Sequence, residues 1–423
     1  MPLLPFDELA FETQTRELDE WRARLDTRPL IHSWDGRLRR DLEVEAVAAS
    51  TSMEGVPVTV EEVRRILAGE RPSGISAADV GLVRGYRGAM EYIQRRADDL
   101  TFEWSPELIK AIQDRVLAGD HRRGAGHYGV GRWVVDSATH DLIFTPPADE
   151  LVADLVEQMC THMNTWEAHP AIKSAWIHVA SAAIHPFKDG NGRTSRVLAS
   201  LAMYRGDFRR PEFCSLEEWW GRHKSDYYAA FKCLGVEWSA SADVTPFIAA
   251  HLAAQLSQVR ALDLRERVNR QVWTALEQIA EDAGLPDRAA NALWDAFNGR
   301  DVLPSFYRRL VDVSEGTGTS DLKILSSARL LRPEGRTKGR RYLAGPALFS
   351  AIATATGVST PEPDRSSIGV ILASRLVDRS GAGSSRTVDA HGSAATVAAG
   401  VVNGPRAAES ETDDSAPRTR TTS

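Results

Sequence analysis

Cysteine is scarce in this chain. The 423 residues include three cysteines, Cys160, Cys214 and Cys233, which lie far apart in the sequence. A disulfide-stabilised scaffold needs paired cysteines and a structural zinc site needs closely spaced ones, so we expect neither. Each cysteine lies in an apolar or aromatic stretch. We therefore expect buried free thiols in a protein that works in a reducing compartment.

Long apolar runs are also missing. No stretch approaches the roughly 20 apolar residues of a membrane-spanning helix, and the N-terminus lacks a basic segment followed by an apolar one. We therefore expect a cytoplasmic protein without a membrane partner. The formal net charge of -7 gives no overall attraction to nucleic acid, so any such binding must be local.

The residues that are present are typical of a soluble and mainly helical protein. Apolar residues make up 43% of the sequence and charged residues 26%, and the length suggests two or three domains. Apolar residues recur at helical spacing over much of the chain. We divide the chain into an N-terminal helical region (1–104), a helical core with a small β-hairpin (105–256), a third unit (257–350) and a mostly disordered tail (351–423), which lacks aromatic residues.

The most informative stretch is HPFKDGNGRTSR, which runs from His185 to Arg196. Apolar segments that we predict to be buried helices lie on both sides of it. Pro186 disfavours a helical conformation at His185, so the first helix should end there and a tight loop should follow. Gly190 and Gly192 then bring bare backbone to the start of the second helix. Free N–H groups and the helix dipole at such a start favour an anion such as phosphate.

The polar side chains of this stretch suit the transfer of a phosphorus-bearing group to a hydroxyl. Arg193 and Arg196 are close enough on one helix to reach phosphate oxygens together. Asp189 offers a carboxylate for Mg2+ on a polyphosphate, and Asn191 offers an amide for a phosphate. His185 remains as a general base. Alone, each residue has a plainer interpretation as a cap, a turn or a solvated charge, and only their joint occurrence favours the functional one.

The same stretch resembles the signature of the Fic (Fido) family, H-P-F-x-D/E-G-N-G-R-x-x-R, and agrees with it at every defined position. The resemblance implies a helical core that transfers a nucleotidyl group, usually AMP from Mg-ATP, to a Ser, Thr or Tyr hydroxyl of a target protein. It implies His185 as the base and Asp189 as the Mg2+ ligand. Kinase-like members carry a Lys at the position of Gly192, so this glycine favours AMP transfer. The residues expected on the nucleotide and its phosphates are Lys188, Gly190, Asn191, Gly192, Arg193 and Arg196.

A second motif precedes this core. In the segment STSMEG, Ser50 and Glu54 share one helical face, and Gly55 suits the end of a helix. Periodicity alone favours a helix C-terminus with a solvated Glu. The segment also resembles the Fic inhibitory motif, S/T-x-x-x-E-G/N. This resemblance implies that Glu54 pairs with Arg196 and fills the space that the ATP γ-phosphate needs, where a carboxylate also repels the triphosphate.

Residues 133–145 are predicted to form a β-hairpin, because two short apolar runs are separated by a polar interval and followed by two prolines. In the family, a hairpin flap at this place binds the hydroxyl-bearing segment of the target by strand addition. The chain departs from many relatives just before the flap. Those relatives have Tyr-Arg, whereas Tyr128 is followed here by Gly129, and the next arginine is Arg132.

Aromatic residues are concentrated after the core motif. Trp219, Trp220, Tyr227 and Tyr228 could stack on adenine, but aromatic residues at helical spacing more often belong to a core. In relatives, a Tyr or Asn in this region helps to hold the nucleobase or ribose. Tyr227 is therefore the predicted nucleotide contact.

Residues 257–350 have the pattern of a helix-turn-helix followed by a hairpin, which resembles a winged helix. In such a module the second helix would enter a DNA major groove and the hairpin turn would meet phosphates. Winged helices also dock proteins, so both kinds of partner stay open. The basic residues of the predicted turn are Arg336, Lys338, Arg340 and Arg341.

Two hypotheses follow. The first is an autoinhibited protein adenylyltransferase that uses ATP and Mg2+. The second is a DNA-binding regulator whose Fic core senses nucleotide or modifies only itself. Within the first, removal of AMP is an alternative, because in some relatives the inhibitory Glu positions a hydrolytic water. A homodimer also stays open, since dimerisation often regulates relatives.

Overall fold

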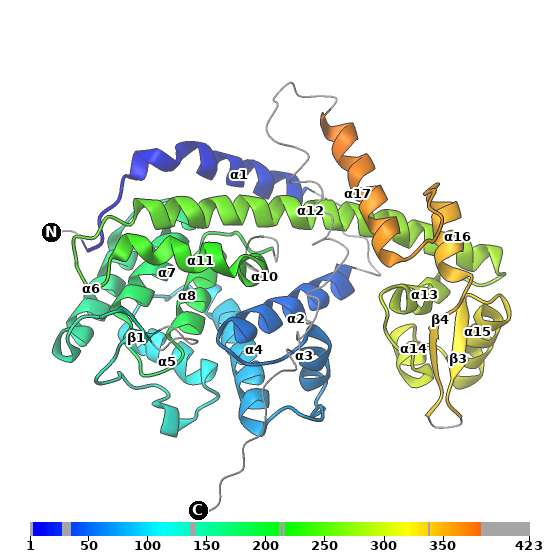
Figure 1. Cartoon of the computed structure of the whole chain (residues 1–423), viewed down its shortest axis with the longest axis horizontal. Coiled ribbons are helices and arrows are strands. Elements are labelled where there is room, and N and C mark those ends of the chain that lie inside the picture. Colours follow the sequence, from blue (N-terminus) through cyan, green and yellow to red (C-terminus); the bar gives the residue numbers. More distant parts are fainter. Residues whose placement is uncertain are drawn as a thin grey trace, which may run out of the picture.

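One helix of 38 residues, α12 (Thr245–Asp282), belongs to both lobes of the molecule (Figure 1). In this computed structural model, residues 3–27, 35–135, 141–210, 213, 216–336 and 339–381 are described. Phe247 and Leu252 of α12 lie in the core of the larger lobe, whereas Trp273 and Leu276 lie in that of the smaller lobe. The predicted boundary after residue 256 thus falls inside a continuous helix. After Pro246 in its first turn, α12 contains no Gly or Pro, so nothing in its backbone favours a break near residue 256.

The larger lobe is helical and surrounds a central pair of antiparallel neighbours, α7 (Pro170–Ile184) and α8 (Asn191–Arg205). Both are buried on nearly all sides, and α8 buries Arg193 and Arg196 together with its apolar and small residues. The other elements of this lobe, besides the first part of α12, are η1 (Glu8–Phe11), α1 (Glu12–Asp26), α2 (Asp35–Met53), α3 (Val60–Leu67), α4 (Ala77–Ala97), α5 (Pro106–Val116), η2 (His121–Arg123), β1 (Val134–Val135), β2 (Leu142–Phe144), η3 (Asp149–Leu151), α6 (Val152–Thr165), α10 (Leu216–Arg222), α11 (Lys224–Ala230) and η4 (Phe231–Leu234).

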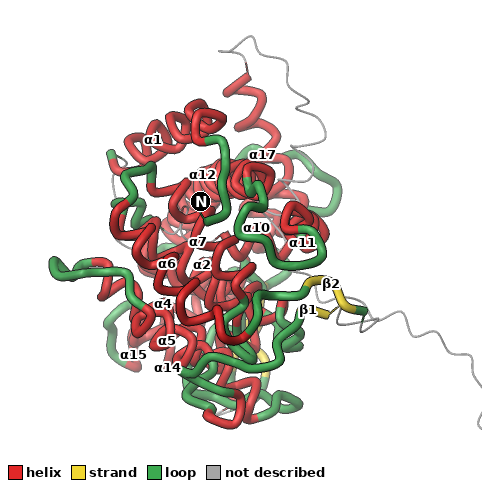
Figure 2. The backbone as a smooth tube through the Cα atoms, turned by 90° about the vertical axis from the view of Figure 1, so that its left-hand side faces the viewer, coloured by secondary structure: helices red, strands yellow, loops and turns green. Residues whose placement is uncertain are grey.

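The predicted hairpin is confirmed. Strands β1 and β2 pair antiparallel, with Val134 opposite Phe144, and Figure 2 shows them at the edge of the helical body. Trp133 and Leu142 are 62% and 61% exposed, so the hairpin presents large apolar side chains to solvent. Residues 136–140, between the two strands, lie outside the described part of the chain.

The smaller lobe packs several of its helices against the last part of α12, and a second antiparallel hairpin lies against other helices of the lobe. Strand β3 pairs with β4, and Val302 adds an isolated bridge to Tyr342. The order of elements is the one expected from the sequence, while the assignment as a winged helix stays a prediction. The elements are η5 (Asp287–Ala289), α13 (Ala290–Phe297), α14 (Pro304–Leu310), α15 (Glu315–Ser327), β3 (Leu331–Glu334), β4 (Arg341–Ala344), α16 (Leu348–Ala355) and α17 (Arg365–Gly381).

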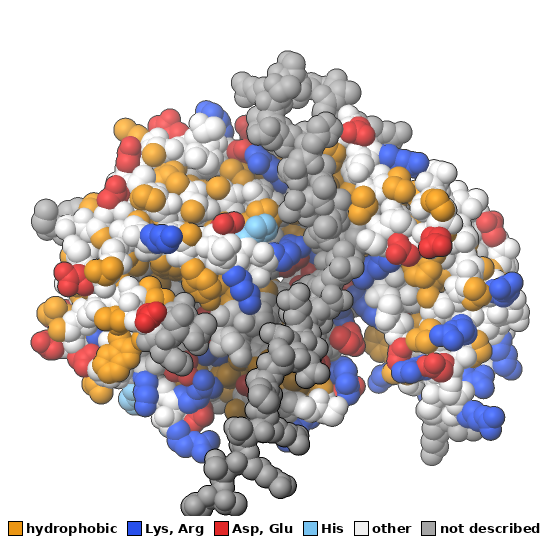
Figure 3. All heavy atoms as spheres, in the orientation of Figure 1, with side chains coloured by type: hydrophobic (Ala, Val, Ile, Leu, Met, Phe, Trp, Pro, Cys, Tyr) orange, Lys and Arg blue, Asp and Glu red, His pale blue; other side chains and the backbone are white. Residues whose placement is uncertain are grey.

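The basic turn of this hairpin is only partly available to a polyanion. Arg341 forms ion pairs with Asp301, at 2.7 Å, and with Glu334. Arg336 and Arg340 are exposed, and Lys338 lies outside the described residues. Figure 3 shows Lys and Arg side chains mixed with Asp and Glu on the visible face of this lobe. DNA binding therefore stays a prediction.

The prediction of a mostly disordered tail from residue 351 does not describe residues 351–381. These residues include most of α16 and all of α17, and Ile368 and Leu372 are almost fully buried in the core of the smaller lobe. The apolar residues of α17 recur at helical spacing, and the helix packs beside α12. The Ser- and Ala-rich composition of the segment concealed this helical pattern. Residues 382–423 lie outside the described part of the chain.

The expectations about the cysteines and about membrane-spanning helices can be compared with the fold. Cys160 is buried and Cys233 is half-buried, both as free thiols, and burial raises the pKa of Cys160 to about 12, so it is poorly reactive at neutral pH. Cys214 lies outside the described residues. Within the described ranges, no helix has both the length and the apolar character that crossing a membrane requires.

Candidate active site

The stretch His185 to Arg196 forms a loop between α7 and α8. Helix α7 ends at Ile184, as Pro186 predicts, and His185 takes a left-handed conformation with φ of +49° that the proline does not by itself predict. Asn191, the first residue of α8, stabilises the loop with its side chain. Its Oδ1 accepts a hydrogen bond from the Phe187 N–H at 2.9 Å, and its Nδ2 donates to the Phe187 carbonyl at 2.8 Å. The amide that we predicted to face a phosphate is thus engaged within the loop.

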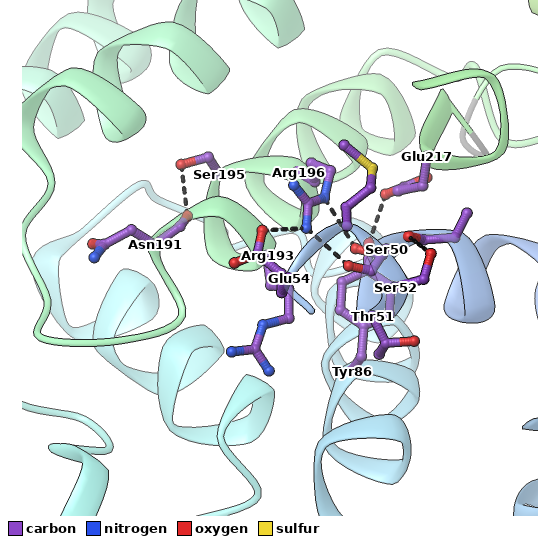
Figure 4. Close-up of polar contacts among 12 residues, drawn as sticks. Ser50, Thr51, Ser52, Glu54, Tyr86, Asn191, Arg193, Ser195, Arg196 and Glu217 are labelled. Atoms are coloured by element: carbon purple, nitrogen blue, oxygen red, sulfur yellow. Dashed lines mark hydrogen bonds and ion pairs between the residues drawn. The ribbon is translucent and has the colours of Figure 1, made fainter. Parts of the chain in front are cut away.

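Arg196 and the end of α2 meet although they are far apart in the sequence (Figure 4). Arg196 Nη2 donates to Glu54 Oε1 at 2.9 Å and to the Ser50 carbonyl at 3.1 Å, and Nε donates to Ser50 Oγ at 3.0 Å. The arginine side chain is 2% exposed and that of Glu54 is 26% exposed. Burial lowers the pKa of Arg196, but Tyr227 and Glu54 oppose this effect and the net pKa is raised.

The Glu54 carboxylate also lies against the beginning of α8. A Cβ atom placed on Gly192 would be 2.4 Å from Glu54 Oε1, so only a glycine permits this approach. The first turn of a helix carries unpaired N–H groups and the positive end of the helix dipole. Glu54 therefore places a negative charge where the helix start favours an anion.

Arg193 has hydrogen-bonding capacity that the protein does not use. Its side chain is 2% exposed, and Nη2 forms an ion pair with Asp189 Oδ1 at 3.2 Å. Among the described residues, the buried Nε and Nη1 atoms have no hydrogen-bond partner. Buried donors without partners carry a desolvation cost of about 1–3 kcal/mol. A bound phosphate group would satisfy them.

Asp189 lies between two arginines at the mouth of the loop. Besides its contact with Arg193, it accepts a hydrogen bond on Oδ2 from Arg123 Nε at 2.7 Å, and 29% of its side chain is exposed. Mg2+ in nucleotide sites is commonly held by one or two carboxylates, phosphate oxygens and water. A partly exposed carboxylate beside a helix start that favours an anion fits that pattern. Lys188, the next residue upstream, is also exposed.

The surroundings of His185 keep its imidazole neutral at pH 7. The pKa of His185 is lowered to about 4, mainly by burial and also by the positive charge of Arg132, while the Ala182 backbone and Glu54 act in the opposite direction. His185 as a whole residue is partly exposed. A neutral and accessible imidazole can accept a proton from a hydroxyl.

Tyr227 is almost fully buried, and its predicted contact with a nucleotide stays a prediction. Its side chain is 3% exposed and packs against Trp220 and Phe231. Its hydroxyl accepts a hydrogen bond from Arg196 Nη1 at 3.3 Å and lies 3.1 Å from His178 Nε2. Tyr227 therefore contacts Arg196 from the core side.

Arg132 is a positioning residue that the sequence analysis did not assign. Its side chain is 2% exposed, and Nη1 donates to the carbonyls of Ile184 at 2.9 Å and His185 at 2.6 Å. Nη2 donates to the Pro147 carbonyl at 2.7 Å, and Nε to Asp149 Oδ1 at 3.0 Å. Arg132 thus joins the end of α7 to the base of the hairpin. Its acceptors are mostly backbone carbonyls, which leave no signal in a sequence.

The glycine that departs from the family pattern has a structural reason. The Gly129 N–H donates to the Pro186 carbonyl at 2.9 Å, and Tyr128 pairs as an antiparallel bridge with Phe187. A Cβ atom on Gly129 would lie 2.5 Å from the Lys188 backbone nitrogen. The segment before the hairpin therefore pairs directly with the His185 loop, and a larger residue would separate the two.

The comparisons with known proteins agree with this fold. The family model described as Fic/DOC family matches residues 103–203, which include the whole His185 loop. Residues 103–203 of the chain therefore form a Fic domain.

Curated relatives are named protein adenylyltransferase Fic. The one from Drosophila melanogaster is 27% identical over 206 residues, which are 46% of this chain and 39% of the relative. The one from Nematostella vectensis is 28% identical over 204 residues, 45% of this chain and 44% of the relative. The chain thus spans about two fifths of the length of these curated relatives.

A solved structure shares the fold. A Fic family protein from Desulfovibrio desulfuricans G20 superposes with a TM-score of 0.53 at 20% sequence identity, over 82% of this chain and 98% of that protein. At this identity the likeness concerns the fold alone.

Proposed function

We propose that this protein is an autoinhibited adenylyltransferase that transfers AMP from ATP to a Ser, Thr or Tyr hydroxyl of a target protein. One observation carries the proposal: the Glu54 carboxylate lies on Arg196 and against Gly192 at the start of α8, where an anion is favoured. The names of the curated relatives support the same activity. Glu54 then acts as an internal substitute for a phosphate group and keeps the site idle.

The reaction uses the neutral imidazole of His185 as a base. The target hydroxyl oxygen forms a bond to the α-phosphorus of ATP, and its proton passes to a nitrogen of His185. The bond between that phosphorus and the oxygen bridging to the β-phosphate breaks, and pyrophosphate leaves with the electron pair. Arg193 and Arg196 stabilise the negative charge on the phosphates through their guanidinium groups.

Asp189 is the residue proposed to hold Mg2+. When bound, the cation would neutralise charge on the phosphate oxygens that leave. Arg123 and Arg193 keep the Asp189 carboxylate in place through their ion pairs. The remaining coordination would come from phosphate oxygens and water, because within the described residues no group of three His, Cys, Asp or Glu side chains could hold a metal.

The target segment is proposed to add as a strand to the hairpin of β1 and β2. Arg132 joins the end of the hairpin to the His185 loop. A segment paired with the hairpin would therefore lie next to the His185 imidazole. Backbone pairing binds many sequences, while side-chain contacts add selectivity. Trp133 and Leu142 would provide apolar contacts for such a segment.

The direct test is intact-mass measurement of the wild-type and Glu54→Gly chains after incubation with ATP and Mg2+. We expect Glu54→Gly to gain the mass of AMP, either on itself or on a target protein supplied with it, while the wild type gains little. Labelled ATP with the label in the α-phosphate should be incorporated, and ATP with a γ-label should not. Transfer of the γ-label would overturn the proposal, and so would no transfer by either protein.

Arg132→Gln, made together with Glu54→Gly, is expected to lower kcat for AMP transfer by roughly 10-fold or more, because a misplacement of about 1 Å can cost up to 100-fold. The change removes hydrogen bonds to the Ile184 and His185 carbonyls, so the imidazole is held less firmly. ATP affinity should change little, because Arg132 does not contact Arg193 or Arg196. The loss of a positive charge should also raise the pKa of His185 and move the acid limb of the pH profile upward.

Arg122→Gln is the matched control for this prediction, since Arg122 lies nearby with a side chain that is 94% exposed. It should behave like Glu54→Gly alone. Arg132→Lys keeps the charge but has fewer donors, so it should retain the pH profile and lose part of kcat. If Arg132→Gln lost ATP affinity and kcat to the same extent, the change would have caused a general structural defect, and Arg132 would not act by positioning His185.

A further inference from the structure

The inhibitory helix α2 has polar contacts on two opposite faces. Ser50 and Glu54, at its C-terminal end, contact Arg196. Asp41 precedes Ser50 by nine residues, which is roughly 180° around a helix of 3.6 residues per turn. Asp41 therefore faces away from Arg196. Figure 1 shows α2 extending from the side of the smaller lobe into the larger lobe.

Asp41 joins α2 to the smaller lobe. Its Oδ2 accepts a hydrogen bond from Arg300 Nη2 at 2.6 Å, and its Oδ1 accepts one from Arg64 Nη1 of α3 at 2.7 Å. Arg300 follows α13, and its side chain is 22% exposed, against 10% for Asp41. Burial raises the pKa of Asp41, but Arg300 and Arg64 outweigh it and the net pKa is lowered. The carboxylate is therefore charged, and the pair is partly shielded from the water that weakens surface ion pairs.

Glu45, one helical turn after Asp41, makes a second contact on the same face. Arg265 of α12 donates to both of its carboxylate oxygens, at 2.6 and 2.7 Å. Such two-point contacts fix orientation as well as distance. Because α12 continues into the smaller lobe, Arg265 and Arg300 hold α2 to one connected body.

The contact at Arg300 is also close to the exposed hairpin of the smaller lobe. Asp301, the next residue, forms an ion pair with Arg341 of β4 at 2.7 Å, and Val302 exchanges backbone hydrogen bonds with Tyr342. The Asp301 and Arg341 side chains are 41% and 46% exposed. A movement of the hairpin can therefore be passed to Arg300, which contacts α2, through the adjacent residues Asp301 and Val302.

We propose that the smaller lobe regulates the active site through α2, with the Arg300–Asp41 ion pair holding the helix where Glu54 reaches Arg196. This inference rests on the proposed function. A helix moves largely as a unit, so its orientation at Asp41 determines where its other end lies. Without the contact to Arg300, α2 has more orientations available, and the fraction of molecules with Glu54 on Arg196 falls. The lobe thus supplies the place where an activating signal acts.

The test is Arg300→Gln in the full chain, with two measurements. Amide hydrogen exchange over residues 41–54 should become faster, and AMP transfer should rise by about 5-fold or more, the lower range of typical coupling between sites. The increase should stay below that of Glu54→Gly. Arg308→Gln is the matched control, because Arg308 lies in the same lobe and pairs with Glu315 at 2.9 Å instead of with α2. It should leave both measurements at wild-type values.

Two further variants separate the outcomes. Arg300→Lys keeps the positive charge and should remain close to the wild type. Arg300→Gln combined with Glu54→Gly should transfer AMP at the same rate as Glu54→Gly alone if Arg300 acts through Glu54, and a further increase would contradict the inference. The inference would be overturned if Arg300→Gln showed the same hydrogen exchange and the same AMP transfer as the wild type while Glu54→Gly was active. The proposed function would then still stand. An inactive Glu54→Gly would instead refute the proposed function, and hydrogen exchange would still report whether Arg300 holds α2.

Discussion

Glu54→Gly is expected to raise AMP transfer by at least about 10-fold. The Glu54 carboxylate accepts a hydrogen bond from Arg196 and lies against Gly192, so ATP must displace it before its phosphates reach the arginine. A charge-assisted hydrogen bond contributes about 1.5–3 kcal/mol. That range corresponds to roughly 10- to 150-fold in an equilibrium constant. The apparent Kd for ATP should fall together with the rise in rate.

Incorporation of labelled AMP and calorimetric titration with ATP measure the two effects of Glu54→Gly. Glu54→Gln keeps the size of the side chain without its charge, so its activity should fall between those of the wild type and Glu54→Gly. Glu157→Gln removes the same charge from the exposed face of α6 and should match the wild type. An apparent Kd for ATP that is the same in Glu54→Gly and the wild type would contradict competition between the carboxylate and the nucleotide.

His185→Ala is expected to lower the rate of AMP transfer by about 100-fold or more in the Glu54→Gly background, because a general base contributes roughly 10²- to 10⁴-fold. ATP binding should persist, since the phosphates are held by Arg193 and Arg196. Single-turnover transfer and ATP titration of the same preparation measure the two properties. His121→Ala changes an exposed histidine outside the loop and should leave both unchanged.

The pH dependence of AMP transfer by Glu54→Gly independently tests whether His185 is the general base. Burial lowers the pKa of His185 to about 4, and the neutral imidazole is the active form. The acid limb of kcat/KM should therefore lie well below the ordinary histidine pKa of about 6.5. Activity should change little from pH 7 to about pH 5 and fall as the pH approaches 4. A midpoint near 6.5 would show that the imidazole is not held in a desolvated site.

The local geometry of the loop could be predicted because its determinants are adjacent in the sequence. Pro186 disfavours a helical conformation at His185, so α7 ends at Ile184 because of a contact between neighbouring residues. Gly190 takes a left-handed conformation with φ of +81° at the start of α8, as a glycine at a helix boundary allows. The anion-binding character of this helix start follows from the backbone alone.

Other residues were assigned differently because their partners come from distant segments. Periodicity favoured a solvated Glu54, and only the resemblance to a known motif implied its contact with Arg196. The burial of Tyr227 by α12 and α10 likewise depends on distant segments. In the same way, burial against the smaller lobe makes α17 a packed helix within a segment whose composition suggested disorder.

The sequence by itself determined the helical class, the Fic signature and the chemistry that its residues offer, because these depend on residue type and on spacing over a few positions. The tertiary structure decided which of those groups are available. It placed the Glu54 carboxylate on Arg196, engaged Asn191 within its loop, and left two donors of Arg193 without a partner among the described residues. The physical reason is that burial and pairing of a charge depend on what packs around it in space.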